Sequence, residues 1–129
     1  AENYGVSDRT KFLPFLPKRE YHQCLSECSF FVLPSVSETF GVVVIEAMAS
    51  GKAVVVRDTV GPRDIVTDGV DGFIFRDINE LTRRIEQLAT DSELRHKMGR
   101  NAKASVTKRF TLEKSALKYE ELYAAMLRK

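Results

Sequence analysis

Two glutamates, Glu38 and Glu46, have the type and spacing to carry chemistry in this chain. Seven residues separate them, and Phe40 and Gly41 lie between them. Carboxylates accept hydrogen bonds from hydroxyl groups, so such a pair suits a ligand with a hydroxyl at each end. Glutamate pairs with this spacing are common in proteins, however. The spacing by itself does not distinguish ligand binding from a purely structural role.

The element that must position both glutamates is the segment 40–51, which we predict to be a helix. Its valines and isoleucine favour a strand on propensity alone. Three features favour the helix instead: Ser37 or Thr39 could cap its start, residues 46–49 are good helix formers, and Gly51 could end it in the left-handed conformation.

A helix that begins near Phe40 would present free backbone N–H groups at its positive end. The predicted donors are Phe40, Gly41, Val42 and Val43, and a diphosphate is a suitable anion for them. Gly41 has no side chain to prevent close approach of a ligand. Eight residues of helix span up to ~12 Å, roughly the length of a nucleotide sugar between its hexose and ribose hydroxyls.

Glu46 interrupts an otherwise apolar helix that must be buried. An unpaired carboxylate there would cost several kcal/mol, so some group has to satisfy it. A ribose diol and a basic side chain from elsewhere in the fold both remain possible partners.

The remaining segments alternate between short β-rich runs and helical patterns, which predicts an α/β fold with a mostly parallel, Rossmann-like sheet. We expect residues 1–129 to form a single domain. The predicted strands are 11–16, 29–33, 52–57 and 73–75, with a helix from Pro17 to about Cys28 and a short turn at 61–64. Further helices are predicted from capping boxes at Asp77/Glu80 and Thr90/Glu93 and from a start at Thr111.

Composition excludes several classes of protein. The chain has 129 residues, of which 43% are hydrophobic and 29% charged, as expected of a soluble globular protein. Its net charge of +2 is too small to indicate nucleic-acid binding. There is no apolar run of roughly 20 residues and no signal-peptide pattern, so we expect a cytoplasmic location. Cys24 and Cys28 lack the spacing of a zinc site, and we expect no metal.

Other polar groups are weaker candidates. His22 and His96 have no partner spaced for metal binding. The basic residues between 95 and 109 could contact an anionic membrane, although a solvated helix face is favoured because no large aromatic anchors are interleaved. Arg57 and Asp58 end a predicted strand at the carboxyl edge of the sheet, where open α/β sheets bind ligands.

The wider sequence resembles the family 4 retaining glycosyltransferases from residue 11 to about residue 127. The order and spacing of several motifs carry this resemblance, with Glu-x7-Glu as the most specific. They are Phe31-Val32-Leu33-Pro34-Ser35, Glu38-Thr39-Phe40-Gly41, Glu46-Ala47-Met48-Ala49, Gly51-Lys52-Ala53-Val54-Val55, Asp71-Gly72-Phe73, Asp91-Ser92-Glu93-Leu94-Arg95, Met98-Gly99 and Arg109-Phe110-Thr111.

The resemblance implies a GT-B enzyme, in which two Rossmann-like domains face a cleft and the C-terminal one holds most of the donor. It implies that this chain is the donor-binding C-terminal portion and lacks the N-terminal acceptor domain. Glu38 would bind donor-sugar hydroxyls near the reacting face, which makes it the candidate catalytic residue. The N–H groups of Phe40 and Gly41 would contact the sugar, those of Val42 and Val43 the diphosphate, and Glu46 the ribose.

The same resemblance implies that Leu16-Pro17-Lys18 contacts the base, and that no metal or other cofactor is needed because the helix dipole stabilises the leaving diphosphate. The chain departs from the family at Pro14, where glycine is usual, and at Gly61-Pro62 with Asp64, where Gly-Gly followed by glutamate is usual. The family's phosphate-binding arginine and lysine would lie before residue 1.

The sequence therefore predicts a fragment of a retaining glycosyltransferase that binds a nucleotide-diphosphate sugar and is inactive alone. One alternative is an inactive nucleotide-sugar-binding or regulatory module of the same fold. A related GT-B epimerase or phosphorylase is a further alternative.

Overall fold

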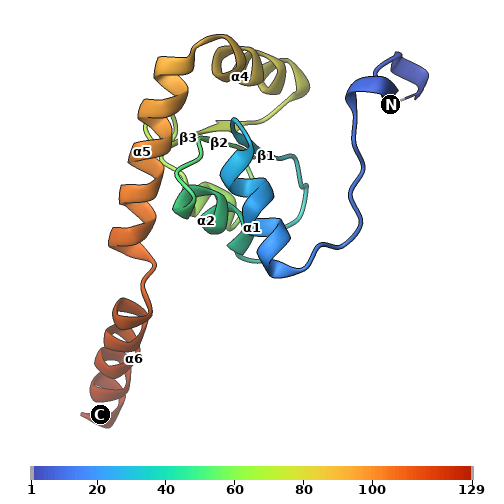
Figure 1. Cartoon of the computed structure of the whole chain (residues 1–129). Helices are drawn as coiled ribbons and strands as arrows, with labels where there is room; N and C mark the ends of the chain where they lie inside the picture. Colours follow the sequence, from blue (N-terminus) through green and yellow to red (C-terminus); the bar gives the residue numbers. More distant parts are fainter. Residues whose placement is uncertain (1, 129) are drawn as a thin grey trace.

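The computed structural model describes residues 2–128, and its centre is a sheet of three parallel strands (Figure 1). The strands lie in the order β1 (Phe31–Leu33), β2 (Val54–Arg57) and β3 (Gly72–Phe75). Val32 pairs with Val55, and Val55 pairs with Phe73. All three strands were predicted, each to within two residues of its observed start.

The central strand β2 is buried on both faces, as its continuous valine run indicates. Val54 and Val56 point to one face, where they join Met48 and Ile65, because side chains alternate along a strand. Val55 points to the opposite face. Its cluster there contains Phe73, Phe75, Leu88 and Met98.

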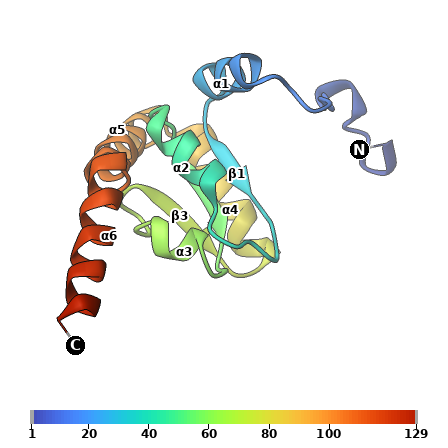
Figure 2. The same cartoon turned by 90° about the horizontal axis from the view of Figure 1, so that it is seen from below.

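Helices cover both faces of the sheet. The face of Val54 and Val56 receives side chains from α1, α2, α3 and α5, and the face of Val55 receives them from α4 and α5. Figure 2 shows α2 and α4 on either side of the sheet. The bounds are α1 (Lys18–Glu27), α2 (Val42–Ala49), α3 (Pro62–Ile65), α4 (Ile78–Thr90) and α5 (Ser92–Arg109).

The end of α2 fits closely against α5. As predicted, Gly51 ends α2 in the left-handed conformation, with φ of +74°. The Gly51 amide donates to the Met48 carbonyl at 2.9 Å and the Lys52 amide to the Ala47 carbonyl at 3.2 Å, which is the Schellman pattern. A Cβ atom at Gly99 of α5 would overlap the Gly51 carbonyl oxygen, so only glycine allows this contact.

Of the three helix starts predicted after residue 76, two are confirmed. The Asp77 side chain accepts from the Glu80 amide at 2.8 Å, and Thr111 caps the last helix. The Thr90/Glu93 capping box is wrong, because Thr90 is still the last residue of α4. Asp91, the only residue between α4 and α5, caps α5 instead, and its carboxylate accepts from the Leu94 amide at 2.8 Å.

The predicted strand 11–16 is also wrong. Two short 3-10 helices, η1 (Glu2–Tyr4) and η2 (Ser7–Arg9), precede this segment, and residues 10–17 then form an irregular chain. Phe12 and Phe15 are 82% and 98% exposed. The apolar composition suggested a strand, but Pro14 and Pro17 each lack the N–H that a ladder requires. Within residues 2–128, no strand pairs with it.

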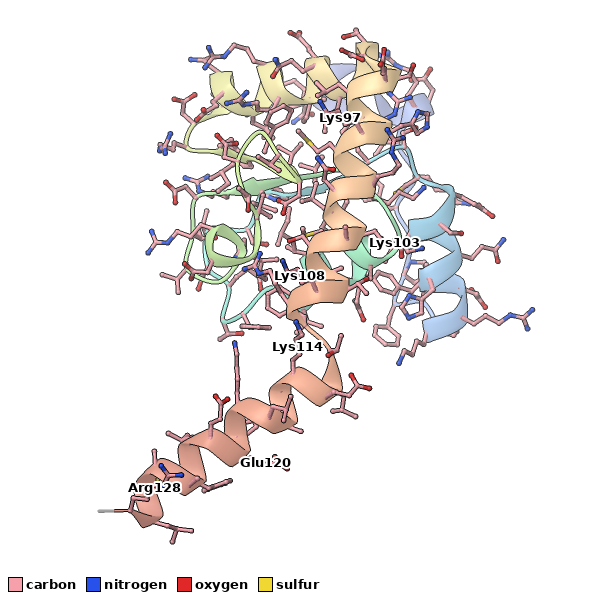
Figure 3. All side chains as sticks on the ribbon, turned by 90° about the vertical axis from the view of Figure 1, so that its left-hand side faces the viewer. Lys97, Lys103, Lys108, Lys114, Glu120 and Arg128 are labelled. Carbon is pink, nitrogen blue, oxygen red and sulfur yellow. The ribbon has the colours of Figure 1, made fainter. Side chains whose placement is uncertain are left out.

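The last helix, α6 (Leu112–Leu127), projects away from the sheet (Figures 1 and 3). None of its residues is buried, and it exposes Leu117, Leu122 and Tyr123. Figure 3 shows Lys97, Lys103 and Lys108 along α5, and these three side chains are exposed, as a solvated face requires. Among the described helices, none has the length and apolar character to cross a membrane.

Candidate functional site

The candidate site lies at the carboxyl edge of the sheet, where ligands bind in open α/β folds. The loop after β1 runs to Gly41, and the loop after β2 runs to Gly61. These two loops meet backbone to backbone. A Cβ atom at Gly61 would lie 2.8 Å from the Phe40 carbonyl oxygen, and one at Gly41 would lie 3.3 Å from Cγ of Pro62.

Both loop glycines also have left-handed backbones. The φ angles are +87° at Gly41 and +93° at Gly61, a region that other residues rarely adopt. The close approach and the conformation together explain why each loop has glycine at this point.

The segment after Gly41 is a helix, as predicted, but it begins later than expected. Helix α2 starts at Val42 and Gly41 is its N-cap, so Ser37 and Thr39 do not cap it. The reason is the turn at Gly41, whose left-handed conformation leads the chain into the helix and leaves Thr39 two residues upstream. The Gly41 carbonyl accepts the first bond, from the Val44 amide at 2.9 Å.

Two of the four predicted amide donors belong to this helix terminus. The N–H groups of Val42 and Val43 make no hydrogen bond within the part of the chain that the structure describes, as first-turn amides do not. Phe40 and Gly41 precede the helix, so their N–H groups belong to the incoming loop. The Phe40 ring packs edge-to-face on Phe110, with 6.2 Å between ring centroids.

Glu46 faces a pocket of about 460 Å³, which we call the apolar pocket. It brings the predicted base-binding loop and the predicted ribose-binding residue together. Its lining residues are Pro14, Phe15, Leu16, Lys18, Tyr21, Val43 and Glu46.

Within this pocket, Glu46 is half-buried and forms no ion pair with any described residue. A basic partner from elsewhere in the fold, one of the two predicted possibilities, is therefore not found among residues 2–128. Tyr21 of α1 has a buried hydroxyl that makes no hydrogen bond of ordinary geometry in the described chain, although it lies near the Glu46 carboxylate. Burial, and then the neighbouring Glu46 carboxylate, raise the pKa of Tyr21 to about 12.

Glu38 lies in a second pocket of about 320 Å³, which we call the polar pocket. Asp58, the residue after β2, also lies there, and it pairs with Arg63 at 3.7 Å and Arg76 at 3.2 Å. Arg57 does not line the pocket. The lining residues are Val36, Ser37, Glu38, Asp58, Thr59, Val60 and Arg63. The two glutamates thus line separate pockets, joined along the chain by the turn into α2.

Sequence reasoning did not assign Tyr21, Thr59 or Arg63 to the site. Thr59 and Arg63 follow the predicted strand 52–57 at the edge where ligands bind, whereas Tyr21 lies inside a predicted helix and had no such signal. Arg109 was noted as part of a motif and of the basic residues between 95 and 109, but its guanidinium donates to the carbonyls of Asp64 and Ile65 at 2.7 Å each and stacks on Phe110. It therefore ties the end of α5 to α3, the short helix that directly follows Gly61.

The described residues contain no group of three or more histidine, cysteine, aspartate or glutamate side chains placed to hold a metal ion. The expectation that no metal is needed stays a prediction.

Comparison with known families gives the class of protein. The sequence profile described as "Glycosyl transferases group 1" matches residues 1–105, and the chain belongs to this family. The match agrees with the motifs around Glu38 and Glu46.

Individual relatives support the same class. A glycosyltransferase of Methanocaldococcus jannaschii is 33% identical over 127 residues, which cover 95% of this chain and 36% of that protein. Sucrose-phosphate synthase from Thermosynechococcus elongatus superposes with a TM-score of 0.88 at 28% identity, covering 98% of this chain and 32% of that one. HepE from Anabaena, solved with UDP, superposes with a TM-score of 0.87 at 28% identity. The superposition covers 96% of this chain and 34% of HepE.

These matches confirm the predicted α/β fold with its parallel, Rossmann-like sheet, and they place it with the GT-B glycosyltransferases. The chain spans about a third of the length of the relatives it matches.

Proposed function

We propose that this chain binds the nucleotide-diphosphate-sugar donor of a retaining glycosyltransferase, for transfer to an acceptor hydroxyl. The observation that carries the proposal is the amino end of α2, where the amides of Val42 and Val43 have no partner among the described residues and lie, along the chain, between Glu38 of the polar pocket and Glu46 of the apolar pocket. In a nucleotide-diphosphate sugar the diphosphate likewise stands between two hydroxyl-bearing groups, the nucleoside and the sugar.

The diphosphate would bind the N–H groups of Val42 and Val43. A helix amino end carries the equivalent of about half a positive charge, which favours an anion there. The same charge would stabilise the diphosphate as it leaves the sugar, so we propose that no metal takes part.

The nucleoside would occupy the apolar pocket. Glu46, which has no ion-pair partner among the described residues, would accept hydrogen bonds from the ribose hydroxyls. The base would cover apolar surface of the loop 14–18, where Phe15 is 98% exposed. HepE of Anabaena, a structural neighbour, was solved with UDP and with UDP-glucose, which supports a nucleotide sugar as the ligand class.

The sugar would occupy the polar pocket. Glu38, half-buried and free of ion pairs within residues 2–128, would accept hydrogen bonds from sugar hydroxyls near the reacting carbon. The N–H groups of Phe40 and Gly41, at the entrance to α2, would contact the same sugar. We propose Glu38 as the residue closest to the chemistry.

We also propose that residues 1–129 fold as one domain and work with an N-terminal acceptor-binding domain, in the cytoplasm. The relatives are about three times longer than this chain, which supports a further domain in the whole protein. Because the acceptor would bind elsewhere, we expect this chain alone to bind the donor without transferring the sugar.

Calorimetric titration with UDP, GDP, ADP and their sugars tests the proposal. Glu46→Gln should weaken binding of the preferred nucleotide about tenfold, because the lost bonds are to a charged acceptor. Glu38→Gln should leave nucleotide affinity unchanged and remove the extra affinity that the sugar adds. Equal affinity for the nucleotide in Glu46→Gln and the parent would contradict the ribose role.

Thermal unfolding of both variants is the control, and neither should melt at a lower temperature than the parent. The full-length protein, assayed for transfer with the preferred donor, should form a product of retained anomeric configuration. Donor binding without transfer in that assay would favour the inactive module.

A further inference from the structure

Tyr21 is a residue of the apolar pocket to which the donor-binding scheme assigns no role. It lies in the first turns of α1, and its ring packs against the core cluster that contains Met48 and Ile65. Its hydroxyl is buried and makes no hydrogen bond of ordinary geometry in the part of the chain that the structure describes. Buried hydroxyl groups are nearly always paired in folded proteins, so this one calls for an explanation.

The polar groups around this hydroxyl narrow the possible partners. Glu46 of α2 and Lys18 of α1 line the same pocket, and the His22 ring lies 5.5 Å from the Tyr21 ring. Of these, only the Glu46 carboxylate is a pure acceptor, while the lysine ammonium can only donate. With its pKa near 12, the Tyr21 hydroxyl keeps its proton at neutral pH and can donate it.

We propose that Tyr21 is a positioning residue for Glu46, and that together they make the apolar pocket selective for a nucleotide with an intact ribose diol. The Tyr21 hydroxyl donates to one oxygen of the Glu46 carboxylate. This contact orients the carboxylate so that its other oxygen accepts from the two neighbouring ribose hydroxyls. The inference rests on the proposed function, because it refines how the same pocket recognises its ligand.

The contact explains how a half-buried carboxylate can be fixed without a cationic partner. A neutral donor leaves the negative charge on Glu46 undiminished, so the carboxylate stays a strong acceptor for hydroxyls. A cation in the same place would instead compete with the ribose for those lone pairs.

The test uses the nucleoside diphosphate among UDP, GDP and ADP that the chain binds most tightly, together with its 2′-deoxy counterpart. The parent should bind the ribonucleotide about tenfold more tightly than the deoxy form, as expected for one hydrogen bond to a charged group. Tyr21→Phe removes only the oxygen. It should weaken ribonucleotide binding about fivefold and leave the deoxy form almost unchanged, so that the selectivity falls.

Two further variants sharpen the test. In the double variant Tyr21→Phe/Glu46→Gln, affinity for the ribonucleotide should be no lower than in Glu46→Gln alone. Tyr21 acts only by orienting the Glu46 carboxylate, so its loss adds nothing once that carboxylate is gone. Tyr119→Phe, which makes the same chemical change on the exposed face of α6, is the matched control and should change neither affinity nor selectivity.

Unchanged selectivity in Tyr21→Phe would overturn the inference, as would equal weakening of the ribose and deoxy forms. If Glu46→Gln weakens binding and Tyr21→Phe does not, the role of Tyr21 fails and the proposed function stands. If the parent binds none of the three nucleotides, the proposed function fails and the role of Tyr21 fails with it.

Discussion

The two pockets at the carboxyl edge of the sheet differ in how they are built. The apolar pocket is lined mainly by carbon atoms of α1 and the loop 14–18, with Glu46 as its single carboxylate. The polar pocket is lined by backbone loops and by Glu38, Asp58 and Arg63. We infer that the apolar pocket gains affinity by burying the base of the nucleotide. In the polar pocket, charge and hydrogen bonds would set the orientation of the sugar.

The supports of the two pockets differ as well. A helix whose Leu25 is buried in the core holds Tyr21 in the apolar pocket. The polar pocket depends on loops that are fixed by the contact of Gly61 with Phe40 and by Arg109. We therefore expect changes in the loop supports to affect the sugar more than the nucleotide.

The largest effect is expected for Gly61→Ala, which breaks the contact between the two loops. The new Cβ would lie 2.8 Å from the Phe40 oxygen and would also stand on a backbone with φ of +93°. We expect the free energy of unfolding to fall by about 2–4 kcal/mol and binding of the nucleotide sugar to weaken more than tenfold. Denaturant unfolding and calorimetry measure the two effects.

Gly69→Ala is the matched control for this variant. Gly69 has a similar φ of +75°, but nothing lies within 4 Å of an added Cβ. Only the backbone cost of about 1–2 kcal/mol should remain, with unchanged affinity. Equal affinity losses in both variants would show that the loop contact does not shape the polar pocket.

Arg109→Ala should have the next largest effect, because it removes the two bonds to the carbonyls of Asp64 and Ile65. We expect a loss of about 1–3 kcal/mol in the free energy of unfolding. Affinity for the nucleotide sugar should fall more than affinity for the free nucleotide. Arg100→Ala, a change at an exposed arginine of the same helix, should stay within about 0.5 kcal/mol of the parent. A parallel loss of both affinities would contradict the separate support of the two pockets.

A smaller effect concerns pH and the apolar pocket. The pKa of Tyr21 is about 12 in the folded chain, against 10.0 for an ordinary tyrosine. Above pH 10 the unfolded chain loses this proton first, so the folded form becomes less stable as pH rises toward 12. Between pH 9 and about 11.5, the free energy of unfolding measured with denaturant should therefore decrease less for Tyr21→Phe than for the parent. The same decrease in both proteins would rule out a buried, proton-bearing Tyr21.

The smallest effect is expected for Arg63→Ala in the polar pocket. Its pair with Asp58 is partly exposed, and Arg76 still neutralises the same carboxylate. The free energy of unfolding should change by less than about 1 kcal/mol, and the change should shrink further at high salt. A larger loss that persists in salt would mean that the polar pocket depends on this ion pair rather than on its backbone contacts.

The sheet and most helices could be predicted because local signals and burial agree there. The valine run 54–56 is continuous and lies on the central strand, and Asp77, Thr111 and Gly51 have the residue types that begin or end helices. Segment 11–16 failed because an apolar run indicates burial only when its backbone can pair, and the prolines prevent that.

The candidate site was predictable only in part. Residue types predicted the helix that carries Glu46, although it begins at Val42 rather than near Phe40, and the roles of Glu38 and Glu46 stay predictions. The N-cap was not predictable, because Gly41 adopts a left-handed conformation against Pro62, a residue from another loop. Tyr21 shares the apolar pocket with Glu46, 25 residues further along the chain, and Arg109 bonds to Ile65, 44 residues before it; no local pattern encodes such pairs.

The projecting helix α6 has a consequence for the dynamics of the chain. With no buried side chain, its 16 residues gain no packing energy, and isolated helices of this length are marginally stable in water. Its backbone amides should exchange with deuterium far faster than those of β2 or α5, and the boundary between slow and fast exchange should fall near Phe110.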